Sequence, residues 1–375
     1  MKVLVVSTLY PMWSDDPTGV FVKAQVAALE NLGVDVRVIV PLPFAPPGAG
    51  RRRRRWNARP SPNHKHLIVV PTFGIPRGSR LTASAFGHVG SAQAVIASRT
   101  IEKWLDGWEP DIVHAHQVLP EGQFAEALAE RTGWSSRVIA TVHGADLHST
   151  QRGSLPSLAR QLARLDRTIV ATSSMKQRVT SMQPIASVSV IPPGVPNLAS
   201  ARETPAAVQW DVTSVGRLVP IKAMERLFPV AAAGHSVAIA GDGPELSRLE
   251  AAAPPGVEFV GAIPPASVRR FMQGGRIYAQ LSLWDGYGIA AAEAMRWGRP
   301  VVLADTVGLS EYVANGIDGL IVHAGNPAEV LGAVDSLLKN PAQATHMGER
   351  GSELIASHSA SCVAERLIKE VYGGA

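Results

Sequence analysis

The chain has 375 residues, more than one hydrophobic core usually holds, so its length predicts two domains of roughly 150 to 200 residues. Hydrophobic residues make up 46% and charged residues 18%, which argues against extensive disorder, and the lone cysteine, Cys362, excludes an internal disulfide and fits a reducing compartment. The net charge of +5 is uneven, because residues 1–190 hold 22 Lys and Arg against 13 Asp and Glu, which gives +9.

The first half of the chain alternates predicted strands and helices. A buried strand over 2–7 precedes an amphipathic helix over 20–32, which Gly33 ends, and a second strand covers 34–40. This order is a βαβ unit, which favours a parallel twisted sheet. The pattern continues with strands over 67–70, 112–115, 137–142, 168–171 and 188–191, and with helices over 83–105, 122–131 and 158–165.

A connection without periodicity separates this series from a second one. Residues 192–209 contain four prolines, and strands are then predicted over 212–215, 237–240, 257–260, 277–282, 301–304 and 320–322. We therefore expect an α/β protein of two Rossmann-like domains that face each other across a cleft. The expected divisions are a first domain over 1–195, a linker over 196–210, a second domain over 211–360, and a C-terminal helix over 361–375 that crosses back to the first domain.

Ligand sites in parallel sheets lie outside the carboxyl ends of the strands, where the strongest motifs occur. Gly216 and Arg217 follow the strand over 212–215, and Lys222 comes five residues after Arg217. Two cations at one strand end can reach a single anion, and a glycine lets the backbone approach it. A diphosphate is the natural ligand, and an ordinary surface pair of cations is the alternative.

A second motif opens a helix with a glycine-rich turn over 285–295. A helix start offers N–H groups and a positive dipole end to phosphate or sugar oxygens. If Asp285 and Glu293 were both helical, they would share one face, about as far apart as a ribose and a hexose. In the alternative interpretation, Asp285 caps the helix and Glu293 is an exposed carboxylate.

With the turn from Gly241 through Gly243 to Pro244, these motifs resemble the retaining glycosyltransferases of family 4, the group 1 transferases of GT-B architecture. The resemblance spans nearly the whole chain, and three motifs occur in register. It implies that Arg217 and Lys222 hold the donor diphosphate, Glu293 the ribose hydroxyls and Asp285 the hydroxyls of the transferred sugar. The resemblance also implies that sugar and phosphate face the backbone of four turn residues: Gly286, Tyr287, Gly288 and Ile289.

The first domain carries two further resemblances to the family. Gly19, with Val20 and Phe21, is similar to the glycine-containing turn whose backbone approaches the phosphates. His143, which begins a His-Gly-Ala-Asp segment ending at Asp146, is similar to the motif whose histidine lies beside the donor sugar. A purely structural histidine at a strand end is the alternative. The loop around Glu311 also resembles a donor-domain loop, without an assigned role.

The donor is expected to be a UDP- or GDP-type sugar, and Asp285 leaves the sugar open because the family usually has Glu there. No two aspartates are separated by a single residue, and no Cys/His cluster is present, so neither a metal nor another cofactor is predicted. Arg217, Lys222 and the helix start would then stabilise the leaving group. The sequence thus predicts a metal-independent retaining transfer of a hexose-type sugar to an acceptor hydroxyl.

The acceptor and the partners are inferred from charge. Arg51–Arg55 and Arg59 lie in a Pro- and Gly-rich segment, for which a solvated loop, an anionic membrane contact and nucleic acid remain open, nucleic acid being least expected. A lipid-linked or cell-envelope glycan is favoured as acceptor, then a small soluble acceptor such as a secondary-metabolite core, then DNA. With neither a secretory apolar region nor a membrane span in the sequence, we expect a cytoplasmic protein, with peripheral contact at the inner membrane face as an option.

Other classes of protein fit the sequence less well. A dinucleotide oxidoreductase needs a glycine fingerprint after its first strand, which residues 7–11 lack. A sugar-nucleotide epimerase would not require the Asp285 and Glu293 motif. A catalytically silent nucleotide-sugar-binding module is the third alternative, against which the complete set of polar motif residues argues.

Overall fold

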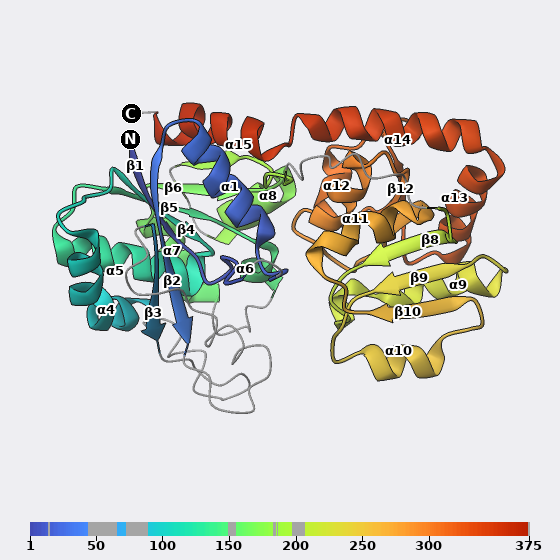
Figure 1. The fold of residues 1–375 in the computed structure, drawn as a ribbon, viewed down its shortest axis with the longest axis horizontal. Helices are drawn as coiled ribbons and strands as arrows, with labels where there is room; N and C mark the ends of the chain where they lie inside the picture. Colours follow the sequence, from blue (N-terminus) through green and yellow to red (C-terminus); the bar gives the residue numbers. More distant parts are fainter. Residues whose placement is uncertain are drawn as a thin grey trace. The chain divides into compact units, whose positions relative to one another are not determined.

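The structure is a computed structural model of the 375-residue chain, and it describes all residues except 14–15, 44–65, 73–88, 149–154, 183–184, 186, 197–206 and 374–375. The chain forms two compact units. Unit 1 contains Met1–Gly194 and Ala360–Ala375, and unit 2 contains Val195–Ser359 (Figure 1). Each unit is built around one parallel sheet, which confirms the predicted pair of Rossmann-like α/β folds.

The sheet of unit 1 has seven strands in the order β3-β2-β1-β4-β5-β6-β7. Val3 to Val6 are completely buried, as expected for a central strand covered on both faces. Val5 pairs with Val38 on one side and with His114 on the other, so the strand order reverses between β1 and β4. The strands are β1 Lys2–Val6, β2 Asp35–Pro43, β3 Leu67–Thr72, β4 Ile112–His116, β5 Arg137–Thr141, β6 Arg167–Val170 and β7 Val188–Val190.

The helices of unit 1 are α1 Val20–Asn31, α4 Val89–Leu105, α5 Gln123–Thr132, α6 Gly144–His148, α7 Leu155–Arg164, α8 Ser173–Met182 and α15 Ala360–Arg366, with π-type turns η1 Val118–Gly122 and η5 Leu367–Tyr372. Gly33, which was predicted to end the helix, follows α1 in the left-handed conformation typical of such a residue. The sequence did not indicate α6 or α8. The first residues of the helix expected over 83–105 lie outside the described residues up to 88.

The C-terminal segment belongs to the core of unit 1. Val363, Ala364 and Leu367 are buried in the same cluster as Val22 and Val26 of α1. Burying an aliphatic side chain of this size contributes about 1.5–3 kcal/mol, so this segment stabilises the unit substantially. Figure 1 shows α15 beside α1, although more than 320 positions separate them in the sequence.

The sheet of unit 2 has six strands in the order β10-β9-β8-β11-β12-β13, and its order reverses between β8 and β11. Tyr278 of β11 pairs with Thr213 of β8 and with Val301 of β12. The strands are β8 Trp210–Val215, β9 Val237–Ala240, β10 Val257–Gly261, β11 Gly275–Gln280, β12 Val301–Ala304 and β13 Leu320–Val322. The helices are α9 Phe228–Ala232, α10 Leu246–Ala252, α11 Pro265–Gln273, α12 Ile289–Arg296, α13 Pro327–Lys339 and α14 Pro341–Ala356, with short 3₁₀ turns η2 Pro220–Lys222, η3 Met224–Leu227 and η4 Gly308–Glu311.

Two predictions concern segments that the structure does not describe. Most of the linker expected over 196–210 lies in the undescribed residues 197–206, and the basic run Arg51–Arg55 with Arg59 lies in 44–65. Among the helices that the structure does describe, none has the length and apolar character needed to cross a bilayer.

Candidate functional site

The loops that follow β8 and β11 lie next to each other where the strand order of unit 2 reverses. Gly216 and Arg217 continue from β8, Lys222 ends η2, and Asp285 follows β11. The two loops are joined through their main chains, because Leu283 N–H donates to the Ile221 carbonyl over 2.8 Å. Adjacent strand ends at such a reversal are where α/β proteins place ligands.

Glycines are required where these loops pack backbone against backbone. Gly241 has φ 149°, and a Cβ there would lie 1.8 Å from the Gly216 oxygen. A Cβ on Gly243 would lie 2.1 Å from the Leu218 oxygen. Leu218 N–H also donates to the Asp242 carbonyl over 3.0 Å. Gly241 and Gly243 therefore shape the loop that carries Arg217.

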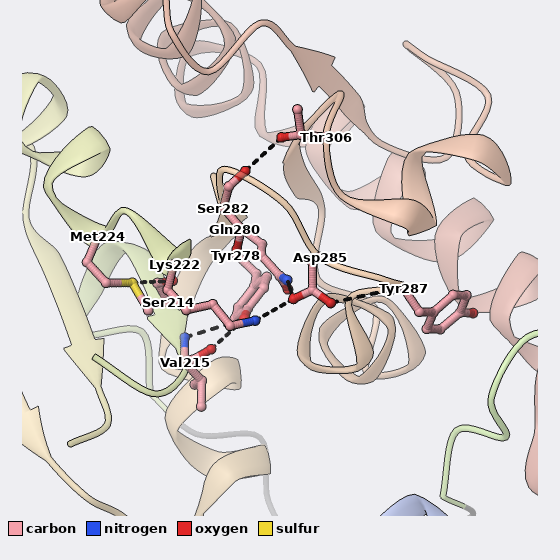
Figure 2. A network of polar contacts seen from close by, with 10 residues as sticks. All are labelled: Ser214, Val215, Lys222, Met224, Tyr278, Gln280, Ser282, Asp285, Tyr287 and Thr306. Carbon is pink, nitrogen blue, oxygen red and sulfur yellow. Dashed lines mark hydrogen bonds and ion pairs between the residues drawn. The ribbon is translucent and has the colours of Figure 1, made fainter. Parts of the chain in front are cut away.

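A polar network surrounds Asp285 (Figure 2). Its Oδ2 forms an ion pair with Lys222 Nζ and also accepts a hydrogen bond from Gln280 Nε2 at 2.8 Å. Its Oδ1 accepts the Tyr287 N–H at 3.3 Å. The side chains of Lys222 and Asp285 remain 27% and 18% exposed, so a ligand can still reach both. An ammonium group and a carboxylate are thus paired at the carboxyl edge of the sheet, where both remain partly exposed.

The segment around Asp285 is extended rather than helical. Asp285 N–H donates to the Thr306 carbonyl over 3.2 Å, and Gly308 N–H donates to the Asp285 carbonyl over 2.9 Å. The helix α12 begins at Ile289, after Gly288 with φ 100°. Asp285 therefore neither shares a helical face with Glu293 nor caps the helix, and both sequence interpretations of its backbone were wrong. The glycine-rich turn places three residues between Asp285 and the first helical position, Ile289, whereas a capping residue directly precedes that position.

Glu293 lies on α12 with a partly buried side chain, so it is not the exposed carboxylate of the alternative interpretation. Burial raises the pKa of Glu293 to about 7. Burial raises the pKa of the completely buried Tyr278, and the nearby charge of Glu293 raises it further. Arg217, by contrast, is exposed beyond the end of β8.

The side chain of Tyr287 points into the interior of unit 2. Its hydroxyl is hydrogen-bonded to His358 Nδ1 at 2.6 Å, and the Tyr312 ring lies 4.8 Å from the His358 ring. Burial raises the pKa of Tyr287 far above its ordinary value. Leu309 N–H donates to the Tyr287 carbonyl over 2.6 Å, which ties the glycine-rich turn to η4, the turn that ends at Glu311.

In unit 1, His143 lies directly beyond β5 in a stack of histidine rings. Its Nε2 is 3.2 Å from His116 Nδ1, and the edge of the Phe21 ring packs against it with centroids 5.2 Å apart. Burial lowers the pKa of His143 to about 4 and that of His116 well below its ordinary value. Both rings are therefore neutral at pH 7.

Asp146 and Gly19 stabilise the loops of unit 1. Asp146 accepts hydrogen bonds from Val118 N–H at 3.0 Å and from His143 N–H at 2.8 Å, and so connects the loops after β4 and β5. Burial raises its pKa to about 7. Gly19 has φ 58°, and a Cβ there would lie 2.1 Å from the Leu9 oxygen. The backbone turn at Gly19 therefore requires a glycine for local packing.

Three polar residues at or just beyond these strand ends were not predicted from the sequence: Gln280, His116 and Glu121. Glu121 is buried in η1, where Thr8 donates to its Oε1 through both N–H and hydroxyl, and burial raises its pKa to about 7. Gln280 and His116 are the last residues of β11 and β4. For these two residues, the available sequence signal was a polar side chain at the end of a largely apolar strand. In the described part of the chain, no group of three or more His, Cys, Asp or Glu residues is arranged to hold a metal ion.

Comparisons with known proteins agree on the family of both units. Residues 200–354 match the family model of glycosyl transferases group 1, and residues 18–197 match that of glycosyltransferase family 4. TuaC of Bacillus subtilis, a candidate teichuronic acid biosynthesis glycosyltransferase, is 26% identical over 83% of this chain and 82% of its own. D-inositol 3-phosphate glycosyltransferase of Frankia alni is 30% identical over 63% of this chain and 68% of its own.

A solved structure gives the same fold. HepE from Anabaena, solved with UDP-glucose, superposes with a TM-score of 0.71 over 100% of both chains, at 16% sequence identity. At this identity the likeness shows the fold alone.

Proposed function

The chain belongs to glycosyltransferase family 4, the retaining group 1 transferases of GT-B fold, and from this premise we propose that it moves a hexose-type sugar from a UDP-linked donor to a hydroxyl of a cell-envelope glycan. Family membership makes it an enzyme that uses a nucleotide-sugar donor. The observation that carries the proposal is the pairing of Lys222 with Asp285 across two adjacent loops, one of which also carries the exposed Arg217 just after β8.

This arrangement suits a sugar diphosphate because it offers both signs of charge at once. Arg217 and Lys222 supply donors for phosphate oxygens, and the carboxylate of Asp285 accepts sugar hydroxyls. An ammonium group has three N–H donors, so Lys222 can contact a phosphate while it remains paired with Asp285. The start of α12 adds N–H groups and a positive dipole end. UDP is favoured over GDP by the fold neighbour HepE, which was solved with UDP-glucose.

In the proposed mechanism, Arg217 and Lys222 stabilise the charge that develops on the departing diphosphate. The acceptor hydroxyl attacks from the face that the diphosphate leaves and gives its proton to the departing phosphate oxygen. The new bond from the acceptor oxygen to the anomeric carbon replaces the bond to the diphosphate on the same face, so the anomeric configuration is retained. Asp285 accepts hydrogen bonds from the sugar hydroxyls through Oδ1, because Lys222 and Gln280 already occupy its Oδ2. His143, which is neutral at pH 7, would lie beside the donor sugar as a hydrogen-bonding group.

The proposed identity of the donor is tested by ligand binding and by nucleotide release. Thermal stabilisation by UDP-glucose, UDP-galactose, UDP-N-acetylglucosamine and GDP-mannose, followed by a nucleotide-release assay, identifies the donor. We expect stabilisation and release with a UDP-sugar in the presence of a chelator. NMR of the product should show the donor's anomeric configuration, and an inverted product would contradict the assignment.

The acceptor half is supported by the similarity to TuaC, whose name refers to teichuronic acid biosynthesis. A second candidate is a small phosphorylated polyol, because the Frankia alni relative is named for D-inositol 3-phosphate. Incubating the enzyme and labelled UDP-sugar with extracted lipid-linked glycans, or with D-inositol 3-phosphate, separates these acceptors. Label that enters only the inositol product would replace the cell-envelope proposal.

Peripheral membrane contact through Arg51–Arg55 is part of the proposal for a lipid-linked acceptor. Each Lys or Arg near an anionic membrane contributes about 1 kcal/mol, so five arginines suffice for salt-sensitive adsorption. Co-sedimentation with phosphatidylserine-containing vesicles should fall with salt, and it should be lost when Arg51–Arg55 are replaced by Ser. Wild-type protein that ignores such vesicles at low salt would refute the contact.

A further inference from the structure

Gln280 is a buried polar residue at the end of an apolar strand. It is 5% exposed, and the residues before it in β11, Ile277, Tyr278 and Ala279, are almost completely buried. Its Oε1 has no hydrogen-bond partner in the described part of the chain. Packing alone would favour an apolar side chain here, because a buried amide that leaves an oxygen unpaired loses hydration without full compensation.

The nitrogen of the same amide has a specific contact. Gln280 Nε2 donates to Asp285 Oδ2 at 2.8 Å, on the same oxygen that pairs with Lys222 (Figure 2). Each carboxylate oxygen has two lone pairs, so these two donors fill Oδ2. Oδ1 accepts the Tyr287 N–H over a longer 3.3 Å and keeps capacity for a further donor. The carboxylate is therefore turned with Oδ1 available to a ligand hydroxyl.

Lys222 cannot be the sole support of this orientation in the proposed reaction. Its ammonium divides three N–H groups between Asp285 and the oxygens of the donor diphosphate, so its hold on Oδ2 weakens when a donor binds. In the proposed reaction Gln280 does not contact the diphosphate, and its amide carries no net charge that would attract the phosphates. When Lys222 turns toward a phosphate, the Gln280 N–H remains on Oδ2.

The amide of Gln280 is also confined by the turn above it. A Cβ built on Gly288 would lie 3.5 Å from Gln280 Nε2 and 2.7 Å from Val307 Cγ1. The amide thus packs closely beneath the backbone of Gly288. The glycine-rich turn and Gln280 hold Asp285 from two sides.

We propose that Gln280 is a positioning residue for the donor sugar. It holds the carboxylate of Asp285 with Oδ1 toward a sugar hydroxyl, and so sets affinity for the sugar portion of the donor rather than for the nucleotide. The inference rests on the proposed function, because it requires a nucleotide sugar at Asp285.

The test compares the affinity for UDP with the affinity for UDP-sugars. Titration calorimetry of wild type and Gln280→Leu with UDP, UDP-glucose, UDP-galactose and UDP-N-acetylglucosamine gives the ratio of the two affinities. The leucine variant keeps a buried side chain but loses the N–H. We expect the preference for the UDP-sugar over UDP to fall about tenfold, while UDP affinity changes by less than about twofold.

Two further variants separate positioning from structure. Gln280→Glu can donate to Asp285 only when protonated, so its preference for the UDP-sugar should be present at low pH and lost as the pH rises. Ser282→Ala is the matched control, because Ser282 Oγ is also buried and unpaired among the described residues, and no hydrogen bond joins it to Asp285. Its preference for the UDP-sugar should equal that of wild type.

An unchanged preference in Gln280→Leu, or a parallel loss of UDP and UDP-sugar affinity, would refute the positioning role. If that variant does not fold, a pH-independent preference in Gln280→Glu refutes it instead. Wild type that binds UDP but prefers no UDP-sugar contradicts the inference alone. Wild type that binds neither overturns the proposed donor, and the inference with it.

Discussion

The carboxyl ends of the two parallel sheets carry polar residues in opposite electrostatic states. In unit 2, Lys222 and Asp285 are partly exposed and paired, and Arg217 is exposed. In unit 1, Asp146 is buried and His143 is partly buried, and burial lowers the pKa of the histidine to about 4 and raises that of the carboxyl to about 7. The same fold thus builds one strand edge that presents formal charge and another that suppresses it.

The difference follows from burial. Desolvation disfavours the charged form of every titratable group, so the enclosed edge of unit 1 approaches neutrality near pH 7. Exposed cations keep their charge and can meet an anionic ligand. Under the proposed function we expect the diphosphate to bind to unit 2, and we expect the buried groups of unit 1 to make its stability depend on pH.

The strongest test of this contrast removes the cations of unit 2. Arg217→Ala and Lys222→Ala should each lower turnover on the order of a hundredfold or more, because each deletes a donor to the departing diphosphate. Turnover is measured by nucleotide release. Arg248→Ala is the matched control, since Arg248 is an exposed cation paired with Glu245 and Glu225. Near-normal rates in both site variants, or strict dependence on added divalent metal, would break the assignment.

Glu293 sharpens the comparison, because it is a carboxyl of unit 2 with the buried character typical of unit 1. Its pKa of about 7 means that it gains charge as the pH rises through neutrality. If it accepts the ribose hydroxyls, donor affinity should increase over that range. Glu293→Gln should weaken UDP binding about tenfold at pH 8 and remove the part of the pH dependence that Glu293 contributes.

Calorimetric titration of UDP at pH 6 and pH 8 measures this effect, and melting curves check the fold. Ser282→Ala again serves as the control in the same unit. UDP affinity that is the same in wild type and Glu293→Gln at pH 8 would reject the ribose role.

Much of the fold was predictable because its strands are short apolar runs closed by turns. Val237–Ala240, Val301–Ala304 and Leu320–Val322 begin and end where the pattern placed them. The helix α6 was not predictable, since five residues are too few to show a period. The π-type turn η1 likewise gives no periodic signal.

The site was predictable to the level of motifs but not of contacts. The charge pattern indicated Arg217, Lys222 and Asp285, yet the pairing of Lys222 with Asp285 depends on the register of β8 beside β11. Gln280 looked like one more strand residue, because its role depends on a partner five positions later, in an extended turn rather than a helix. Sequence spacing does not reveal such a turn.

The smallest expected effect is on stability and concerns Glu121 in unit 1. Burial raises its pKa from 4.5 to about 7, so the folded protein binds a proton there that the unfolded chain releases between these values. The contribution of this proton to stability is fully present below about pH 4.5 and is lost as the pH rises through about 7. Glu121→Gln cannot ionise, while its side-chain oxygen can still accept from Thr8. The variant's Tm relative to wild type should therefore rise by a few degrees between pH 5 and pH 8.

Histidines with lowered pKa change stability in the opposite direction, because they favour the folded state as the pH rises through 6.5. They are common to both proteins, so their contribution cancels in the difference in Tm. A difference in Tm that stays constant across this range would show that Glu121 is already charged in the folded protein, and the contrast between the two sheet edges would fail at this residue.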